Sequence, residues 1–242
     1  MVILIRKRHL HVLTLFLSLF FCAVLLLWQD RAETLSVMGE TKLPESPRIF
    51  VIDAGHGGED GGAVAADGTP ESGLNLEIAL RLNDLLRFCG EKTVLVRSED
   101  ISLNDPGLAT FRQRKSSDLK NRVDFVNNTS DAILISIHQN ALPSVPSVHG
   151  AQAFYNKIPG AKDLAEKIQN RLNQAVNQGN EKSTRAIPES IYLMKQSHAP
   201  SVLVECGFLS NAEETQKLKS PSHQIQITAA ILSGLLAEPV PF

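Results

Sequence analysis

Residues 49–63 read IFVIDAGHGGEDGGA, and this stretch decides the fold class. A nearly continuous apolar run ends at Asp53 and passes directly into His56 among glycines. Such a run, without polar alternation, is typical of a strand covered on both faces in a parallel sheet. Ligands of open α/β sheets bind beyond the carboxyl ends of the strands, so His56 falls where a site is expected. A dinucleotide-binding fingerprint is excluded, because Asp60 stands where its third glycine would be.

From Arg48 onward the chain alternates short apolar runs with longer amphipathic stretches. The apolar runs predict strands at residues 49–54, 93–96, 132–137, 151–155, 191–194 and 201–204. The amphipathic stretches predict helices at about 71–89, 116–127, 161–177 and 221–237. This alternation predicts one α/β domain over residues 48–242, with a mostly parallel or mixed central sheet.

The N-terminal residues have a different character. Residues 10–28 contain no Asp, Glu, Lys or Arg and follow the basic residues 6–8. At about 1.5 Å per residue a helix of this length crosses about 30 Å of hydrocarbon, and the preceding charges place its start in the cytoplasm. We predict that residues 1–29 are a membrane anchor of an extracytoplasmic domain, with a cleaved signal segment as the alternative. The polar residues 30–47 are predicted to form a linker.

Composition excludes several classes of protein. The chain has 24 Lys and Arg against 26 Asp and Glu, and this net charge of −2 argues against a nucleic-acid partner. Its 3 cysteines show no CxxC spacing, which excludes a cysteine-built zinc site and a disulfide-rich scaffold. We expect Cys89 and Cys206 to be free thiols.

Two histidines and a glutamate are candidate metal ligands. His138 follows the buried run AILISI as His56 follows the first strand, and Glu71 opens the first predicted helix. His, Glu and His with an open fourth position are typical of catalytic zinc sites, although a structural role for each strand-end histidine stays open. Asp53 either accepts a hydrogen bond from His56 or simply ends its strand. Asn140 either contacts substrate or fixes the turn after its strand.

Glu205 is a candidate general base. It ends the apolar run SVLVE, where an ionised carboxylate is costly unless it is paired or linked to a metal. Such a group can take a proton from a metal-bound water. The alternative is a structural ion pair with Arg97 or Arg122, both of which we expect to be partners of buried carboxylates.

Several segments together carry a resemblance to a known family. They are GHGGEDGGA with Glu71 behind it, VLVR-SED, SIHQNA and VLVECGFLSN, in this order over nearly all of residues 48–237. They resemble the zinc-dependent N-acetylmuramoyl-L-alanine amidases of the amidase-3 type. The resemblance implies a twisted, largely parallel six-stranded sheet with helices on both faces, and peptidoglycan as substrate. It implies one zinc ion per chain held by His56, Glu71 and His138, with Glu205 as the catalytic residue; cobalt or manganese would accept similar ligands.

Two further segments resemble the germination-specific, spore-cortex branch of this family. They are FRQRKSSDLKNRVDFVNN at residues 111–128 and IPESIYLMK at residues 187–195. The branch implies that stem peptides are removed during cortex maturation and that a separate deacetylase then completes the muramic δ-lactam. An activator protein is a further expected partner.

Other functions stay open at this point. One is a vegetative cell-wall amidase of the same family. Another is a non-hydrolytic peptidoglycan-binding or activator domain, and a third is a zinc carboxypeptidase or endopeptidase that acts within the stem peptide. The occupied position of Glu205 argues against a pure binding module, because binding alone needs no general base.

Overall fold

The structure is a computed structural model, and it describes residues 48–237. Its elements are β1 (Ile49–Ala54), α2 (Glu71–Phe88), β2 (Thr93–Leu95), α3 (Phe111–Asn127), β3 (Ala132–Asn140), β4 (Gln152–Tyr155), α4 (Ala161–Ala175), β5 (Arg185–Ala186), α5 (Tyr192–Gln196), β6 (Ser201–Phe208), α6 (Ala212–Leu218) and α7 (Pro221–Leu235). The predicted anchor at residues 10–28 and the linker at 30–47 lie outside the described residues. Among residues 48–237, no helix is long and apolar enough to cross a membrane.

The strands of the described residues form one six-stranded sheet in the order β2-β1-β3-β6-β4-β5. Strands β2, β1, β3 and β6 run parallel, β4 is antiparallel to β6, and β5 is parallel to β4. The predicted α/β class and mostly parallel sheet are therefore confirmed. Because β1, β3 and β6 are parallel neighbours, their carboxyl ends meet at one edge of the sheet, where α/β proteins bind their ligands.

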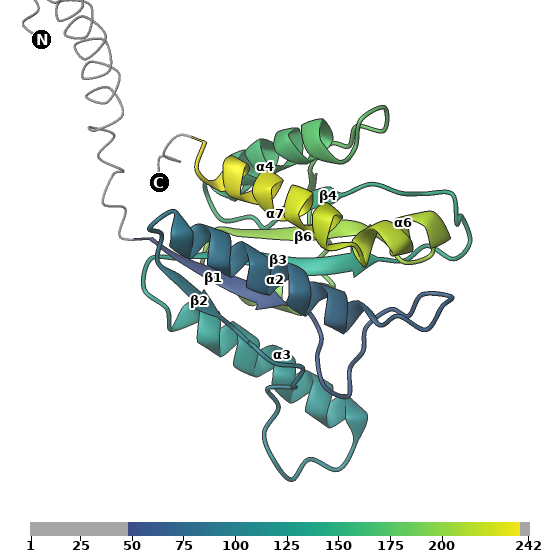
Figure 1. Cartoon of the computed structure of the whole chain (residues 1–242). Coiled ribbons are helices and arrows are strands. Elements are labelled where there is room, and N and C mark those ends of the chain that lie inside the picture. Colours follow the sequence, from purple (N-terminus) through teal and green to yellow (C-terminus); the bar gives the residue numbers. More distant parts are fainter. Residues whose placement is uncertain (1–47, 238–242) are drawn as a thin grey trace, which may run out of the picture. The chain divides into compact units, whose positions relative to one another are not determined.

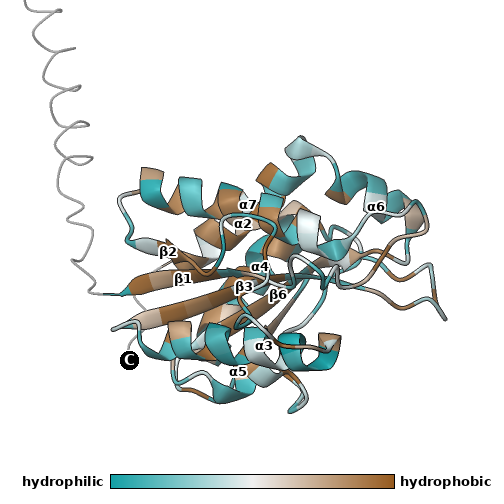
Figure 2. Ribbon diagram, turned by 90° about the horizontal axis from the view of Figure 1, so that it is seen from below, coloured by the Kyte–Doolittle hydropathy of each residue, from teal (hydrophilic) through white to brown (hydrophobic). Residues whose placement is uncertain are grey.

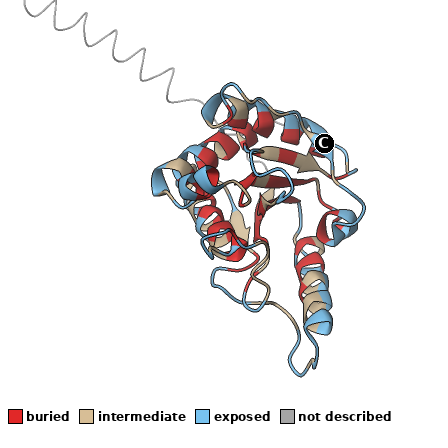
Figure 3. Ribbon diagram, turned by 90° about the vertical axis from the view of Figure 1, so that its right-hand side faces the viewer, coloured by how far each residue is buried: buried red, intermediate tan, exposed pale blue. Residues whose placement is uncertain are grey.

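Helices cover both faces of the sheet, with α2, α4 and α7 on one face and α3 and α5 on the other (Figures 1 and 2). Figure 3 shows that the buried residues lie where these layers meet. Alternate strand residues point to opposite faces. Thus Ile135 and Ile137 enter the larger core beneath α2 and α7, whereas Leu134 enters the smaller core beneath α3. By the same alternation His138 points to the α3 side.

Helix α3 begins at Phe111, earlier than the predicted start near residue 116. A capping box causes the early start. The side chain of Thr110 accepts a hydrogen bond from the Gln113 backbone N–H at 3.3 Å, and the Gln113 side chain accepts one from the Thr110 N–H at 3.0 Å. These bonds satisfy N–H groups that have no partner within the first helical turn.

The predicted strand at residues 191–194 is wrong. These residues enter helix α5 (Tyr192–Gln196), and Arg185–Ala186 takes the place beside β4 as strand β5. Leu193 and Met194 are consecutive and both buried in the smaller core. A strand would send consecutive side chains to opposite faces, whereas a helical turn buries both beneath α3.

The expected free thiols are confirmed. Cys89 is half-buried at the end of α2, and Cys206 is buried in β6; within residues 48–237 both are free cysteines.

Candidate active site

The ends of β1 and β3 and the start of α2 bring the predicted ligands His56, Glu71 and His138 together. One ligand atom from each lies within 4.8 Å of the other two. His56 Nε2 is 3.3 Å from Glu71 Oε2, and His138 Nδ1 is 2.9 Å from Glu71 Oε1. The two imidazole rings meet edge to face, with their centroids 5.1 Å apart. Two imidazoles thus converge on the Glu71 carboxylate, which completes a group of three potential ligands.

Glu71 is held in place from several sides. Its Oε1 accepts hydrogen bonds from Asn75 Nδ2 and from the backbone N–H of Gln139, both at 3.1 Å. Its Oε2 accepts one from the backbone N–H of Ala63 at 2.9 Å. Burial disfavours the charged form, but the hydrogen bonds and charges of the two histidines outweigh it and hold the pKa of Glu71 well below its usual value. Glu71 is therefore a fixed anion at the centre of the cluster.

His56 is oriented by Asp60. Its backbone has φ 62°, which is uncommon for a residue other than glycine. Its Nδ1 lies 2.9 Å from Asp60 Oδ2, and Lys115 Nζ lies 3.0 Å from the same oxygen. The Asp60 carboxylate at Nδ1 fixes the orientation of the ring, so that Nε2 faces Glu71. In the structure it is Asp60, and not Asp53, whose carboxylate contacts His56 Nδ1.

Asp53 belongs instead to a buried ion pair. Arg122 Nη1 lies 2.6 Å from Asp53 Oδ1, and Arg122 Nε lies 2.7 Å from Asp118 Oδ2. The Ser136 hydroxyl also donates to Asp53, at 2.7 Å. Burial opposes ionisation, but the Arg122 charge and these hydrogen bonds lower the pKa of Asp53. Since Arg122 Nη2 donates to the His56 carbonyl oxygen at 2.6 Å, the pair also anchors the loop that carries His56.

Glu205 lies opposite His138 on the neighbouring strand. It lines the same cavity as the three potential ligands, a cleft of about 470 Å³. Its Oε2 is shielded from solvent and has no hydrogen-bond partner among the described residues. Burial and the negative charge of Glu71 raise the pKa of Glu205 to about 7, against the opposing effect of the histidines. A carboxylate with this pKa can both take up and release a proton near neutral pH.

The arginines that were alternative partners of Glu205 bind other groups. Arg97 donates to backbone carbonyl oxygens, those of Ala54, Gly55 and Ser72. Arg122 is paired with Asp53 and Asp118. Within residues 48–237, no ion pair joins Glu205 to either arginine. The expectation of an arginine–carboxylate pair therefore holds for Arg122 and not for Arg97.

Some residues of the site were not predicted from the sequence. Asp60 and Asn75 each lie four positions after the ligand that they contact. On helix α2 a spacing of four residues places Asn75 beside Glu71, so this contact could have been predicted from the sequence. In the glycine-rich loop the same spacing between His56 and Asp60 does not predict a contact. Asn140 lines the cavity, and its Oδ1 accepts a hydrogen bond from the Ala141 N–H at 2.7 Å, so it fixes the turn after β3.

The sequence of residues 50–237 matches the Amidase_3 family of N-acetylmuramoyl-L-alanine amidases. The chain belongs to this family. It is an amidase of peptidoglycan, which confirms the family resemblance and the assignment as an enzyme.

Two curated amidases of Bacillus subtilis (strain 168) are similar to the chain. It is 37% identical to the germination-specific N-acetylmuramoyl-L-alanine amidase over 195 residues, which cover 80% of this chain and 81% of that protein. It is 33% identical to the N-acetylmuramoyl-L-alanine amidase LytC over 209 residues, which cover 85% of this chain but 38% of LytC.

Solved structures show the same fold. The CwlD amidase from Clostridioides difficile, solved in complex with the GerS lipoprotein, has a TM-score of 0.74 and 38% identity, over 77% of this chain and 95% of that one. A second amidase, from Clostridium difficile 630, has a TM-score of 0.67 and 29% identity, over 78% of this chain and 95% of that one.

Gly55 provides a test of how the amidase holds His138. A Cβ at this position would lie 2.2 Å from His138 Cε1. We expect Gly55→Ala to displace the imidazole and to weaken binding of a divalent metal ion such as zinc by about 10- to 100-fold, measured by calorimetric titration. Gly73→Ala on α2 is the matched control, because a Cβ there meets nothing within 4 Å. Wild-type metal affinity in Gly55→Ala would contradict the expectation.

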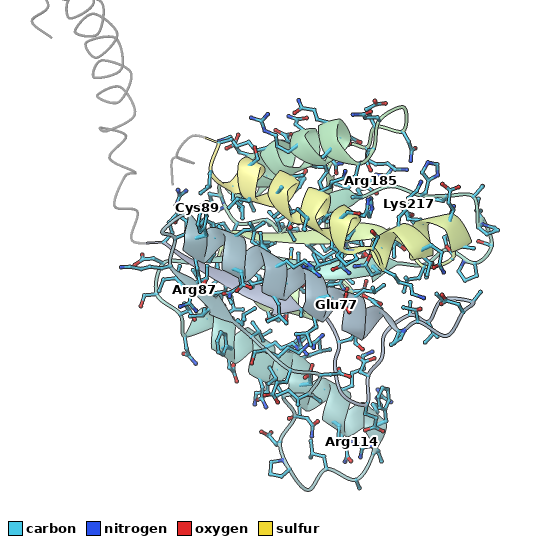
Figure 4. The ribbon with its side chains drawn as sticks, viewed as in Figure 1. Glu77, Arg87, Cys89, Arg114, Arg185 and Lys217 are labelled. Carbon is cyan, nitrogen blue, oxygen red and sulfur yellow. The ribbon has the colours of Figure 1, made fainter. Side chains whose placement is uncertain are left out.

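The buried Arg122 network makes a prediction about stability. Arg122→Met leaves Asp53 and Asp118 without a counter-charge, and we expect a loss of about 3–5 kcal/mol in urea unfolding. Because folding lowers the pKa of Asp53, its contribution is complete above about pH 4 and is lost as the pH falls through the folded value. Arg114→Met, which removes a surface pair with Glu59 at the outer end of α3 (Figure 4), should have little effect. Equal unfolding free energies for the two variants would refute this role of Arg122.

Proposed function

We propose that the amidase is a zinc hydrolase in which His56, Glu71 and His138 hold the metal and Glu205 transfers the proton. Two imidazole nitrogens and one carboxylate oxygen are a donor set typical of catalytic zinc sites. The ligand atoms already lie within 4.8 Å of one another. The observation that carries the proposal is the Glu205 carboxylate oxygen, which is buried and unpartnered in the cavity that these ligands line.

The chain's own residues divide the work of hydrolysis. When bound, zinc supplies Lewis acidity to the scissile carbonyl and to the attacking water. Glu205 accepts a proton from that water as its oxygen adds to the carbonyl carbon. Glu205 then returns the proton to the nitrogen as the carbon–nitrogen bond breaks, so the products are the lactyl carboxylate of N-acetylmuramic acid and the free amine of L-alanine. Asp60 keeps the His56 ring in one orientation throughout.

Glu205→Gln tests the proton-transfer role. We expect kcat to fall by about 100- to 10,000-fold, because the amide cannot accept the proton, while the zinc content stays at one ion per chain. Removal of the metal with a chelator should abolish wild-type turnover, and added zinc should restore it. The measurements are release of peptides with a free L-alanine amine from muropeptides and metal content by mass spectrometry. Glu166→Gln on the exposed face of α4 is the control.

Two results would count against these roles. Loss of zinc in Glu205→Gln would make Glu205 a ligand, and turnover by metal-free wild-type protein would exclude a zinc mechanism. Cleavage within the stem peptide, with L-alanine left on the sugar, would instead indicate a peptidase.

We further propose that the amidase acts in maturation of the spore cortex. The identity with the germination-specific amidase of Bacillus subtilis and the similarity to CwlD support this role. Residues 10–28 would anchor the enzyme outside the cytoplasmic membrane, and a lipoprotein activator would bind it, as GerS is bound to CwlD in that structure. A vegetative cell-wall role is the alternative.

The cortex role is testable in a reconstituted reaction. Peptidoglycan treated with the amidase and then with a muramic acid deacetylase should yield muramic δ-lactam, because lactam closure needs a muramic acid whose lactyl carboxyl carries no peptide. Mass spectrometry of muramidase digests measures the product. The control replaces the amidase by Glu205→Gln, and an equal lactam yield from both would contradict the role.

A further inference from the structure

A second groove adjoins the catalytic cavity on the α3 side. It has a volume of about 410 Å³. It is lined by side chains of α3 and α5, namely Phe111, Arg112, Lys115, Leu119, Lys120 and Tyr192. Three of these, Lys115, Leu119 and Tyr192, line the catalytic cavity as well. The two hollows therefore share a wall, and a substrate that fills one can continue into the other.

The shared wall lies close to the reaction centre. Lys115 Nζ is 3.0 Å from Asp60 Oδ2, and that oxygen is 2.9 Å from His56 Nδ1. Lys115 is thus two hydrogen bonds away from a candidate metal ligand. An extended peptide advances at most about 3.6 Å per residue, so a group one or two residues beyond the scissile amide can pass this wall.

The groove is positively charged. Its cations are Arg112, Lys115 and Lys120, and none of the described residues that line it is acidic. Asp60 offsets the charge of Lys115. Arg112 and Lys120 are exposed and form no ion pair within residues 48–237. Two cations are therefore available to a ligand beside the catalytic cavity, on a chain whose overall net charge is −2.

Two aromatic side chains complete the groove. Phe111 is 44% exposed and Tyr192 is 42% exposed, so both rings are accessible to a ligand in the groove. Lys115 Nζ lies 5.9 Å from the centroid of the Phe111 ring. Aromatic faces between cations suit a ligand whose carbon skeleton packs on the rings while its anionic groups meet the charges.

We propose that this groove binds the stem peptide of the substrate through its free carboxylates, with Arg112 and Lys120 as the residues that determine specificity for an acidic peptide. The proposal rests on the amidase function above. The residue that follows L-alanine in the stem is a γ-linked D-glutamate, whose α-carboxylate is free unless it is amidated. The positive charge of the groove favours the peptide over the glycan. The lactyl carboxyl of the sugar forms the scissile amide and therefore carries no charge.

The test uses two substrates that differ in one charge. They are N-acetylmuramoyl-L-alanyl-D-glutamate γ-methylamide, which has the free α-carboxylate, and N-acetylmuramoyl-L-alanyl-D-isoglutamine γ-methylamide, in which that group is an uncharged amide. In both, the γ-methylamide stands for the γ-link of the stem, so no second carboxylate is present. Values of kcat and KM are measured for the full-length chain and for Arg112→Gln/Lys120→Gln. A matched double variant, Lys162→Gln/Arg185→Gln, removes the same charges elsewhere; Arg185 lies on β5, at the opposite edge of the sheet from β2 (Figure 4).

The subsite predicts a change in KM for one substrate. In Arg112→Gln/Lys120→Gln we expect KM for the acidic substrate to rise about 5- to 10-fold with kcat unchanged, as the loss of two exposed charge interactions implies. KM for the amidated substrate and both constants of the control variant should not change. The wild-type preference for the acidic substrate should shrink as salt screens the charges.

Failure of the subsite and failure of the amidase function give different results. The subsite proposal is overturned if wild type has equal KM values for the two substrates, or if the double variant raises both KM values equally. If wild type hydrolyses neither substrate, the amidase function fails. Calorimetric binding of L-alanyl-D-glutamate γ-methylamide then decides the subsite alone: weaker binding to the double variant supports it, and equal binding overturns it.

Discussion

The buried ion pair of Arg122 with Asp53 and Asp118 is the interaction on which the site depends. Arg122 lies on α3, yet it reaches the end of β1 and donates to the carbonyl oxygens of Ala54 and His56. One guanidinium therefore joins a helix, a strand and the loop that carries a candidate ligand. Its planar set of donors fits two carboxylates and two carbonyl oxygens at once, which a lysine could not do.

The cavity holds two glutamates in opposite electrostatic environments. Glu71 is surrounded by donors and two imidazoles, so its pKa lies well below the usual range and it remains an anion. The Oε2 atom of Glu205 is shielded from solvent and receives no hydrogen bond among the described residues, and burial and the charge of Glu71 raise the pKa of Glu205 to about 7. When the surroundings move the pKa values of two carboxyl groups apart, one residue type can provide both a permanent anion and a group that exchanges protons near neutral pH.

Helix α3 serves two surfaces of the molecule. The side that bears Asp118 and Arg122 is buried toward the sheet and holds the loop of His56. The side that bears Arg112 and Lys120 is exposed and lines the groove beside the catalytic cavity. A rigid helix that is anchored through the first side holds the second at a constant place relative to the reaction centre. In the functions proposed above, α3 therefore couples recognition to catalysis.

The α/β class, the order of most elements and the candidate residues His56, Glu71, His138 and Glu205 follow from the amino-acid sequence. Buried strand runs and motif residues are local patterns, so they can be recognised without the fold. The pairing of the charged groups follows only from the folded arrangement. Arg122 and Asp53 are far apart in the chain, and no local pattern relates them. The helical state of residues 191–194 and the groove beside α3 were also decided there, because packing between distant segments overrides local preference.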